Sequence, residues 1–276
     1  MPSNREAYFE ALKLDIPKSV IEFALKEVNG FSNLELTKNF DEEIKDYPFY
    51  KNVINRYING EMIEYIFNKS YFLSLPFFVN KDVLIPRQET EQLVLRTVEM
   101  IKEMFGDSVI NVADVCTGSG CIGISIAKAL PKNNYFLTDI SKEALRVTKN
   151  NTVLCLESNV KCLQGDMLNP LIGTKLDVIV CNPPYISNTS GIDEKTWKQE
   201  PHLALLAEPA TLYYEKVFQE CNSLMNSKYL LAFEIGEDTE EELAKLVDKY
   251  LPGTTYFFEK DIYGKTRFLF IKQESV

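Results

Sequence analysis

The sequence is poor in the residues that build metal centres and histidine-dependent active sites. One of its 276 residues is a histidine, His202, so a metal site or a catalytic triad built on several histidines is excluded. It has six cysteines, but none lies in a Cys-x-x-Cys pair. Several occur in apolar runs, where cysteine behaves as a small hydrophobic residue. We therefore predict neither a bound metal nor a disulfide framework.

Long apolar runs and an excess of basic charge are also lacking. No run is long enough to cross a bilayer, and the N-terminus, Met1-Pro2-Ser3-Asn4, has no apolar stretch typical of a signal peptide. We therefore expect a cytoplasmic protein with no membrane partner. The net charge of −10 argues weakly against duplex DNA as the main substrate, and we expect no stable nucleic-acid binding. A local basic groove would still be compatible with this total.

What the chain does have is the composition of a globular protein with two distinct regions. Residues 1–67 show helical hydrophobic spacing. A capping box at Ser19 and Glu22 is predicted to open one helix, and a second helix is predicted over about 40 to 58. Residues 68–86 are rich in aromatic and β-branched residues, which predicts a β-hairpin linker. Residues 87–276 form the remaining, larger domain.

The larger domain alternates apolar strand-like runs with helical segments. Strands are predicted over residues 109–116, 135–139, 160–164, 176–181 and 229–235, and Thr239 is predicted to cap a helix that ends near Tyr250. This alternation predicts an α/β fold with a parallel sheet covered by helices on both faces. The last two predicted strands, 256–260 and 266–272, flank a turn and should add an antiparallel hairpin.

The segment Asn182-Pro183-Pro184-Tyr185 directly follows the apolar run 176–181. Proline fixes its own φ, lacks an N–H and holds the preceding residue extended. The Asn182 side-chain oxygen and the Pro183 carbonyl would therefore form a stiff pair of acceptors for a planar amino group, beside the Tyr185 ring. Asn-Pro is also a common turn dipeptide. The end of a buried strand, however, is where α/β sheets bind ligands.

A glycine-rich loop marks a second candidate site. Residues Asp114 to Gly120 join the first strand of the larger domain to a helix, where glycines permit a tight turn and free N–H groups face a ligand. Residues 118–123 match G-x-G-x-x-G, and Asp139 ends the next strand about 20 positions further on, as a ribose-binding acid does. On this pattern alone, a nicotinamide-dependent dehydrogenase is an open alternative.

Two more strand ends favour S-adenosylmethionine over a nicotinamide. Asp166 follows the third strand and is placed to accept a hydrogen bond from an adenine amino group, with Met167 packed on the ring. Asn182 follows the fourth strand. Each acid alone is also typical of a solvated strand end, but a glycine loop, two acids and an amide at four successive strand ends fit S-adenosylmethionine better. The predicted cofactor-binding residues are Cys116, Thr117, Gly118, Ser119, Gly120, Asp139, Asp166, Met167 and Asn182.

With these motifs, the chain resembles the PrmC/HemK family, the glutamine methyltransferases of peptide chain release factors. The resemblance covers most of the chain and includes Leu84-Ile85-Pro86-Arg87 before Glu89-Thr90-Glu91, Glu200-Pro201 and Glu234-Ile235-Gly236. Asn-Pro-Pro-Tyr is shared with amino-methyltransferases of nucleic acids, whereas the Leu-Ile-Pro-Arg block is more particular to the release-factor enzymes. The chain departs from the family at Cys116, where Gly is usual, and at Met167, where an aromatic residue is common.

The resemblance implies a Rossmann-like class I methyltransferase fold that uses S-adenosylmethionine and releases S-adenosylhomocysteine. It implies that the substrate is the glutamine of the Gly-Gly-Gln loop in a class-1 release factor, which residues 1–67 would bind. Asn182, Pro183 and Tyr185 would be catalytic, and Pro184 would join them in binding the substrate. The alternatives are an adenine amino-methyltransferase of nucleic acids, a dehydrogenase and a module that holds S-adenosylmethionine without turnover.

Overall fold

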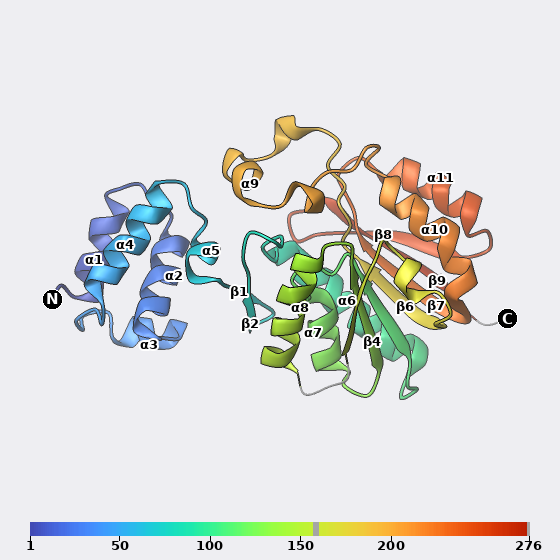
Figure 1. The fold of residues 1–276 in the computed structure, drawn as a ribbon, viewed down its shortest axis with the longest axis horizontal. Helices are drawn as coiled ribbons and strands as arrows, with labels where there is room; N and C mark the ends of the chain where they lie inside the picture. Colours follow the sequence, from blue (N-terminus) through green and yellow to red (C-terminus); the bar gives the residue numbers. More distant parts are fainter. Residues whose placement is uncertain (157–159, 275–276) are drawn as a thin grey trace. The chain divides into compact units, whose positions relative to one another are not determined.

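The computed structural model describes residues 1–156 and 160–274, and the chain divides into two compact units. The helical unit comprises residues 1–69 together with residues 193–199, and the larger unit comprises residues 70–192 and 200–276. The order of the chain alone does not indicate that residues 193–199 group with the N-terminal helices. The elements of both units are labelled in Figure 1.

The helical unit is built around its own apolar core. Its helices are α1 (Asn4–Leu12), α2 (Lys18–Asn29), α3 (Asn33–Lys38), α4 (Tyr47–Ile58), α5 (Ile63–Phe67) and α9 (Glu194–Gln199). Ile21, Leu25 and Val53 are fully buried in the core, because the apolar residues of α2 and α4 recur at helical spacing.

The predicted capping box at Ser19 is wrong. Helix α2 begins at Lys18, after Pro17, and has no side-chain cap. The φ of −55° at Pro17 is pre-set by its ring, so the helix starts two residues earlier than predicted and Ser19 falls inside the first turn. Capping boxes occur instead at Ser3 with Glu6 and at Ser32 with Glu35.

The larger unit contains a seven-stranded sheet between two layers of helices (Figure 1). The strand order is β5-β4-β3-β6-β7-β9-β8. The first five strands are parallel, and β9 runs antiparallel to both β7 and β8. The strands are β3 (Asn111–Val115), β4 (Asn134–Asp139), β5 (Val160–Gln164), β6 (Leu176–Cys181), β7 (Met225–Glu234), β8 (Thr255–Lys260) and β9 (Thr266–Gln273).

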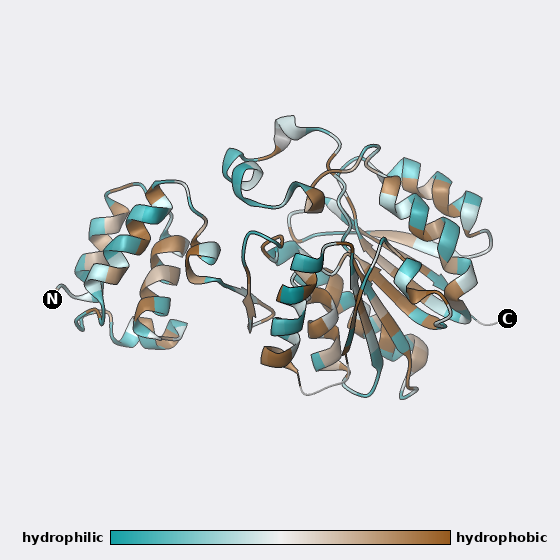
Figure 2. Cartoon of the chain, viewed as in Figure 1, coloured by the Kyte–Doolittle hydropathy of each residue, from teal (hydrophilic) through white to brown (hydrophobic). Residues whose placement is uncertain are grey.

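Helices cover both faces of this sheet. Side chains of α6 (Gln88–Phe105) and α7 (Cys121–Ala129) pack in the core on one face, and those of α10 (Leu212–Leu224) and α11 (Glu240–Tyr250) in the core on the other. Helix α8 (Lys142–Cys155) and the small hairpin of β1 (Lys69–Phe72) and β2 (Leu75–Phe78) complete the unit. Much of the sheet is brown in Figure 2, with teal positions between. The longest buried apolar runs are in β6 and β7, as expected for parallel strands buried on both faces.

Two further sequence expectations can be compared with the structure. The predicted capping box at Thr239 is wrong, because the Thr239 hydroxyl donates to the Gly236 carbonyl at 2.8 Å and leaves α11 without a side-chain cap.

In the part of the chain that the structure describes, no helix is both long and apolar enough to pass through a membrane.

The register of the sheet brings the functional segments to one edge. Val115 of β3 pairs with Cys181 of β6 and with Thr138 of β4, and Asp139 pairs with Gln164 of β5. The carboxyl ends of the four strands are therefore level. The chain order reverses between β3 and β6, which is where doubly wound sheets bind their ligands.

Candidate active site

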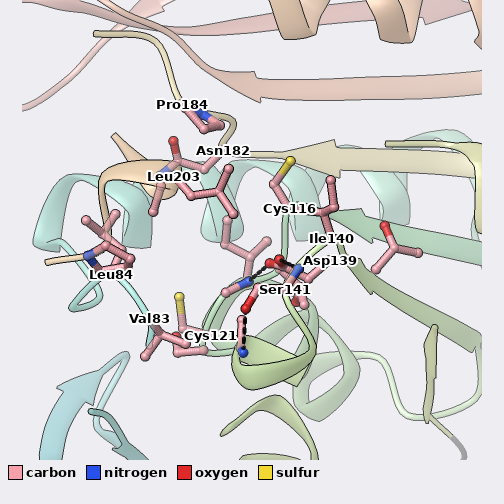
Figure 3. Close-up of a pocket in the computed structure, with 18 of the residues that line it drawn as sticks. Val83, Leu84, Cys116, Cys121, Asp139, Ile140, Ser141, Asn182, Pro184 and Leu203 are labelled. Atoms are coloured by element: carbon pink, nitrogen blue, oxygen red, sulfur yellow. Dashed lines mark hydrogen bonds between the residues drawn. The ribbon is translucent and has the colours of Figure 1, made fainter. Parts of the chain in front are cut away.

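A cavity of about 150 Å³ lies in the larger unit at this edge of the sheet (Figure 3). It is bounded by the ends of β3 to β6, by residues 82–90 and by residues 201–204. The predicted site residues that line it are Cys116, Thr117, Gly118, Ser119, Asp139, Asp166, Met167, Asn182 and Pro184. Gly120, Pro183 and Tyr185 are not among its lining residues.

The two glycines of the loop after β3 have different surroundings. Gly118 has a φ of +54°, and a Cβ there would meet nothing within 4 Å. Gly120 has a φ of +84°, and a Cβ there would lie 2.8 Å from the Ile124 Cδ1 atom. Gly118 therefore leaves space at the cavity, whereas Gly120 permits close packing at the start of α7.

Side chains of α8 hold this loop in place. The Thr148 hydroxyl donates to the Gly118 carbonyl at 2.8 Å, and the Asn151 amide donates to the Ser119 carbonyl at 2.8 Å. Sequence reasoning missed both residues. The signal that could have identified them is their polar character on the buried face of an amphipathic helix, where a polar side chain needs a partner.

The Asp114 side chain stabilises the same loop through hydrogen bonds. Its Oδ2 atom accepts hydrogen bonds from the Thr117 hydroxyl at 2.5 Å and from the Gly123 N–H at 2.9 Å. Its Oδ1 atom is buried and has no partner among the described residues. Burial raises the pKa of Asp114 to about 7, against the effect of the two hydrogen bonds.

Cys116 and Met167 both adopt left-handed backbone conformations, with φ of 60° and 46°. Glycine is favoured in this region of φ because it has no Cβ. The sulfur atoms of the two residues lie 3.7 Å apart. The chain thus places two polarisable side chains on the cavity wall at positions where the backbone itself would favour glycine.

The two strand-end acids are engaged in different ways. Asp139 accepts from the Gly118 N–H and the Ser141 N–H, both at 2.9 Å. Burial raises its pKa, and these backbone hydrogen bonds act in the opposite direction. The Asp166 Oδ2 atom lies 3.1 Å from the Lys216 Nζ atom of α10. Each carboxylate keeps acceptor capacity for a ligand, since a carboxylate offers about four lone-pair positions.

The Asn-Pro-Pro-Tyr segment is connected to buried polar groups on neighbouring elements. The Asn182 Nδ2 atom donates to the Thr90 hydroxyl at 3.4 Å, and the Tyr185 hydroxyl donates to the Glu234 Oε1 atom at 3.2 Å. Thr90 belongs to α6 and Glu234 ends β7. Sequence reasoning assigned neither residue a role.

An ion pair joins two distant blocks of sequence beside the cavity. Arg87 pairs with the buried Glu200, whose Oε1 atom also accepts from the Ile85 N–H at 3.0 Å. Pro86 and Pro201, next to these residues, both line the cavity. Residues 1–156 and 160–274 contain no cluster of three or more His, Cys, Asp or Glu side chains able to hold a metal ion.

The sheet with its antiparallel last hairpin, and the cavity beside its glycine loop, define the class I methyltransferases. A family model described as "Methyltransferase small domain" matches residues 92–199. A methyltransferase from Pyrococcus furiosus superposes with a TM-score of 0.55 at 16% identity, over 82% of this chain and 100% of that one.

Curated relatives narrow the class to one family. A release factor glutamine methyltransferase of Bacillus cereus is 34% identical over 260 residues, which is 92% of each chain. One from Flavobacterium psychrophilum is 37% identical over 218 residues, which is 75% of this chain and 74% of the relative. The chain belongs to the family of release factor glutamine methyltransferases, which confirms the resemblance found in the sequence.

Proposed function

We propose that this protein transfers a methyl group from S-adenosylmethionine to the side-chain amide nitrogen of the glutamine in the Gly-Gly-Gln loop of a class-1 peptide chain release factor. The observation that carries the proposal is Asn182 on the cavity wall, at the carboxyl end of β6, in a chain whose relatives are named for this reaction. We further propose that the protein acts in the cytosol.

The cavity has the chemical groups that S-adenosylmethionine requires. Gly118 leaves open space beside the loop, and we assign the Asp139 carboxylate to the ribose hydroxyls. We assign Asp166 to the adenine amino group, with the Met167 side chain as an apolar surface for the ring. Both Asp166 and Met167 line the cavity. When bound, S-adenosylmethionine supplies an electrophilic methyl group on a sulfonium sulfur, and S-adenosylhomocysteine is the product.

The role of this chain's residues is to orient a poor nucleophile. The lone pair of an amide nitrogen is delocalised into its carbonyl, so the nitrogen has to be held in line with the methyl group. We assign the Asn182 Oδ1 atom and the Pro183 carbonyl as acceptors for the two N–H groups of the substrate. Pro184 and Tyr185 complete the substrate contact. Such orientation is worth several powers of ten in rate, and the extra proton leaves after transfer without a dedicated base.

The helical unit is proposed to bind the body of the release factor. It carries its own core and, on its surface, several large apolar side chains, including Phe9, Leu34 and Ile58, which are 48%, 63% and 51% exposed. Apolar groups on a protein surface are suited to a protein partner. This assignment rests on the family and on these exposed side chains.

The decisive experiment incubates the protein with radiolabelled S-adenosylmethionine and the unmethylated cognate release factor. Label should enter the factor, and replacing the loop glutamine of the factor by alanine should abolish it. Intact-mass measurement of the factor gives the same readout without label. Labelling that survives the glutamine replacement, or that enters RNA or DNA instead, would contradict the proposed substrate.

Asn182→Ala tests the assigned acceptor. We expect kcat to fall about 10²-fold, the size of effect produced by removing one oriented hydrogen-bonding group in other enzymes. Asn150→Ala is the matched control, because Asn150 is exposed on α8 and is not one of the residues that line the cavity. An unchanged turnover in Asn182→Ala would remove Asn182 from the mechanism.

A further inference from the structure

A buried carboxylate connects the two ends of the Asn-Pro-Pro-Tyr segment. Glu234 is 3% exposed and accepts one hydrogen bond on each oxygen. The Thr90 hydroxyl donates to Oε2 at 2.6 Å, and the Tyr185 hydroxyl donates to Oε1 at 3.2 Å. Thr90 in turn lies 3.4 Å from the Asn182 Nδ2 atom. The chain of contacts therefore runs from Asn182 through Thr90 and Glu234 to Tyr185.

The direction of each hydrogen bond in this chain follows from the chemistry of the groups. An ionised carboxylate only accepts, so the Thr90 hydroxyl has to donate its one hydrogen to Glu234. The distance of 2.6 Å is typical of a hydroxyl donating to a charged carboxylate. Thr90 then has only lone pairs left for Asn182. The side chain of Asn182 must present its Nδ2 hydrogens to Thr90 and turn its Oδ1 atom the other way.

A neighbouring cation favours the ionised form of Glu234. The pKa of Glu234 is raised overall, by burial and by the charge of Glu89, while the Thr90 hydrogen bond, the Arg267 charge and the Tyr185 hydroxyl act in the opposite direction. Arg267 is itself held in place, with its Nε atom 3.4 Å from the Asp261 Oδ2 atom. The carboxylate therefore has both donors and a positive charge around it.

We propose that Glu234 and Thr90 are positioning residues that fix the amide of Asn182 with its oxygen facing the substrate. The proposal rests on the proposed function. The two ends of an asparagine amide have nearly the same shape, so packing alone does not distinguish them. Hydrogen-bond polarity does, and here it is set by a buried carboxylate that is not among the residues lining the cavity. The same carboxylate holds Tyr185 and so fixes both ends of the substrate-binding segment.

Thr90→Val tests the relay with little change of side-chain shape. Removing the hydroxyl should lower kcat for methylation of the unmethylated release factor by roughly tenfold, the equivalent of one lost hydrogen bond. The Kd of S-adenosylmethionine and the KM of the factor should stay within about twofold, as expected when only the reacting geometry is disturbed. Thr90→Ser retains the hydroxyl and should restore most of the activity.

Glu234→Gln should lower kcat at least as much as Thr90→Val. A glutamine offers one acceptor and one donor end, so it has to reverse the hydrogen bond to either Thr90 or Tyr185. If Thr90 is the residue reversed, its hydroxyl donates to Asn182 and turns the Asn182 Nδ2 atom toward the substrate. The donors of Asn182 and of the substrate would then face each other.

A double-mutant cycle separates positioning from general structural damage. Thr90 acts through Asn182, so Thr90→Val should have no further effect on kcat in the Asn182→Ala background. An equal fall of kcat in both backgrounds would overturn the proposal, as would wild-type kcat in Thr90→Val. The proposed function is tested separately, by whether the wild-type protein methylates the loop glutamine of the factor.

Discussion

At the scale of single residues, Asp114 makes the stability of the protein depend on pH. Burial raises its pKa to about 7, whereas an aspartate in an unfolded chain has a pKa near 3.9. The folded state therefore favours the protonated acid. The stabilisation from this proton is complete below about pH 4 and is lost as pH rises through about 7.

Asp114→Asn removes this titration and keeps the shape of the side chain. Between pH 5 and pH 8, the unfolding free energy of the variant should rise by about 2–3 kcal/mol relative to the wild type. Urea unfolding at both pH values measures the difference. Asp107→Asn controls for the loss of one carboxylate, since Asp107 is exposed. A difference between Asp114→Asn and wild type that is constant with pH would show that Asp114 stays ionised throughout.

The sequence predicts a site residue well when its position at the end of a predicted strand is enough to identify it. Asp139 ends β4, Asp166 lies two residues after β5, and Asn182 directly follows β6. The structure places all three on one cavity. Thr90 and Glu234 are 144 residues apart in sequence, and nothing in their local surroundings indicates that they meet. Whether the predicted residues bind cofactor and substrate stays a prediction for the experiments above.

At the scale of elements, the loop between β3 and α7 requires its two glycines for different reasons. Gly120→Ala places a Cβ 2.8 Å from the Ile124 Cδ1 atom and 3.0 Å from the Thr148 Cγ2 atom, at a φ of +84°. Gly118→Ala meets no atom within 4 Å, at a φ of +54°. The first substitution adds a clash to backbone strain, and the second adds strain alone.

We therefore expect Gly120→Ala to lower the unfolding free energy by about 2–4 kcal/mol, and Gly118→Ala by about 1 kcal/mol. Gly118→Ala should instead raise the Kd of S-adenosylmethionine, because its methyl group occupies the cavity side of the loop. Chemical denaturation ranks the two variants by stability, and a titration with S-adenosylmethionine ranks them by cofactor affinity. Equal losses of stability would contradict the distinction between packing and open space.

Local backbone geometry decides which of the Ser-x-x-Glu patterns in the sequence forms a capping box at a helix end. The strands and their alternation with helices are predictable, because burial on both faces demands continuous apolar runs. The pattern Ser-x-x-Glu occurs at Ser19 and at Ser32, but only Ser32 forms a capping box. Near Ser19, Pro17 takes the N-cap position and moves the start of the helix by two residues.

Ser32→Ala should lower the unfolding free energy by about 1 kcal/mol, the usual value of a serine N-cap. Ser19→Ala is the matched control and should change it by less than about 0.5 kcal/mol, as exposed positions without a cap do. Urea unfolding followed by circular dichroism measures both. A loss at Ser19 as large as that at Ser32 would show that the cap of α2 forms in solution after all.

At the scale of the whole molecule, the class and family follow from sequence patterns, whereas the grouping of residues 193–199 with the helical unit does not. The alternation of strands and helices predicts the parallel sheet and its terminal hairpin, and the structure confirms both. Residues 193–199 follow the Asn-Pro-Pro-Tyr segment in the chain, yet they group with the N-terminal helices. That grouping depends on tertiary contacts, which hydrophobic periodicity cannot supply.

The two units have separate apolar cores, so a substitution can weaken one and spare the other. Leu25 is fully buried in the core of the helical unit, and Leu231 of β7 is fully buried in the larger unit. Each substitution by alanine should cost about 2–5 kcal/mol in its own unit. Leu25→Ala should raise the KM of the release factor and leave the Kd of S-adenosylmethionine within about twofold, because ligand binding depends on the fold of its own unit. In Leu231→Ala, cofactor binding should be lost at a lower temperature than in the wild type.

If Leu25→Ala weakened cofactor binding as much as Leu231→Ala does, the two units would unfold together. If the KM of the release factor stayed unchanged while the helical unit of Leu25→Ala was unfolded, the proposed role of that unit in binding the factor would be contradicted.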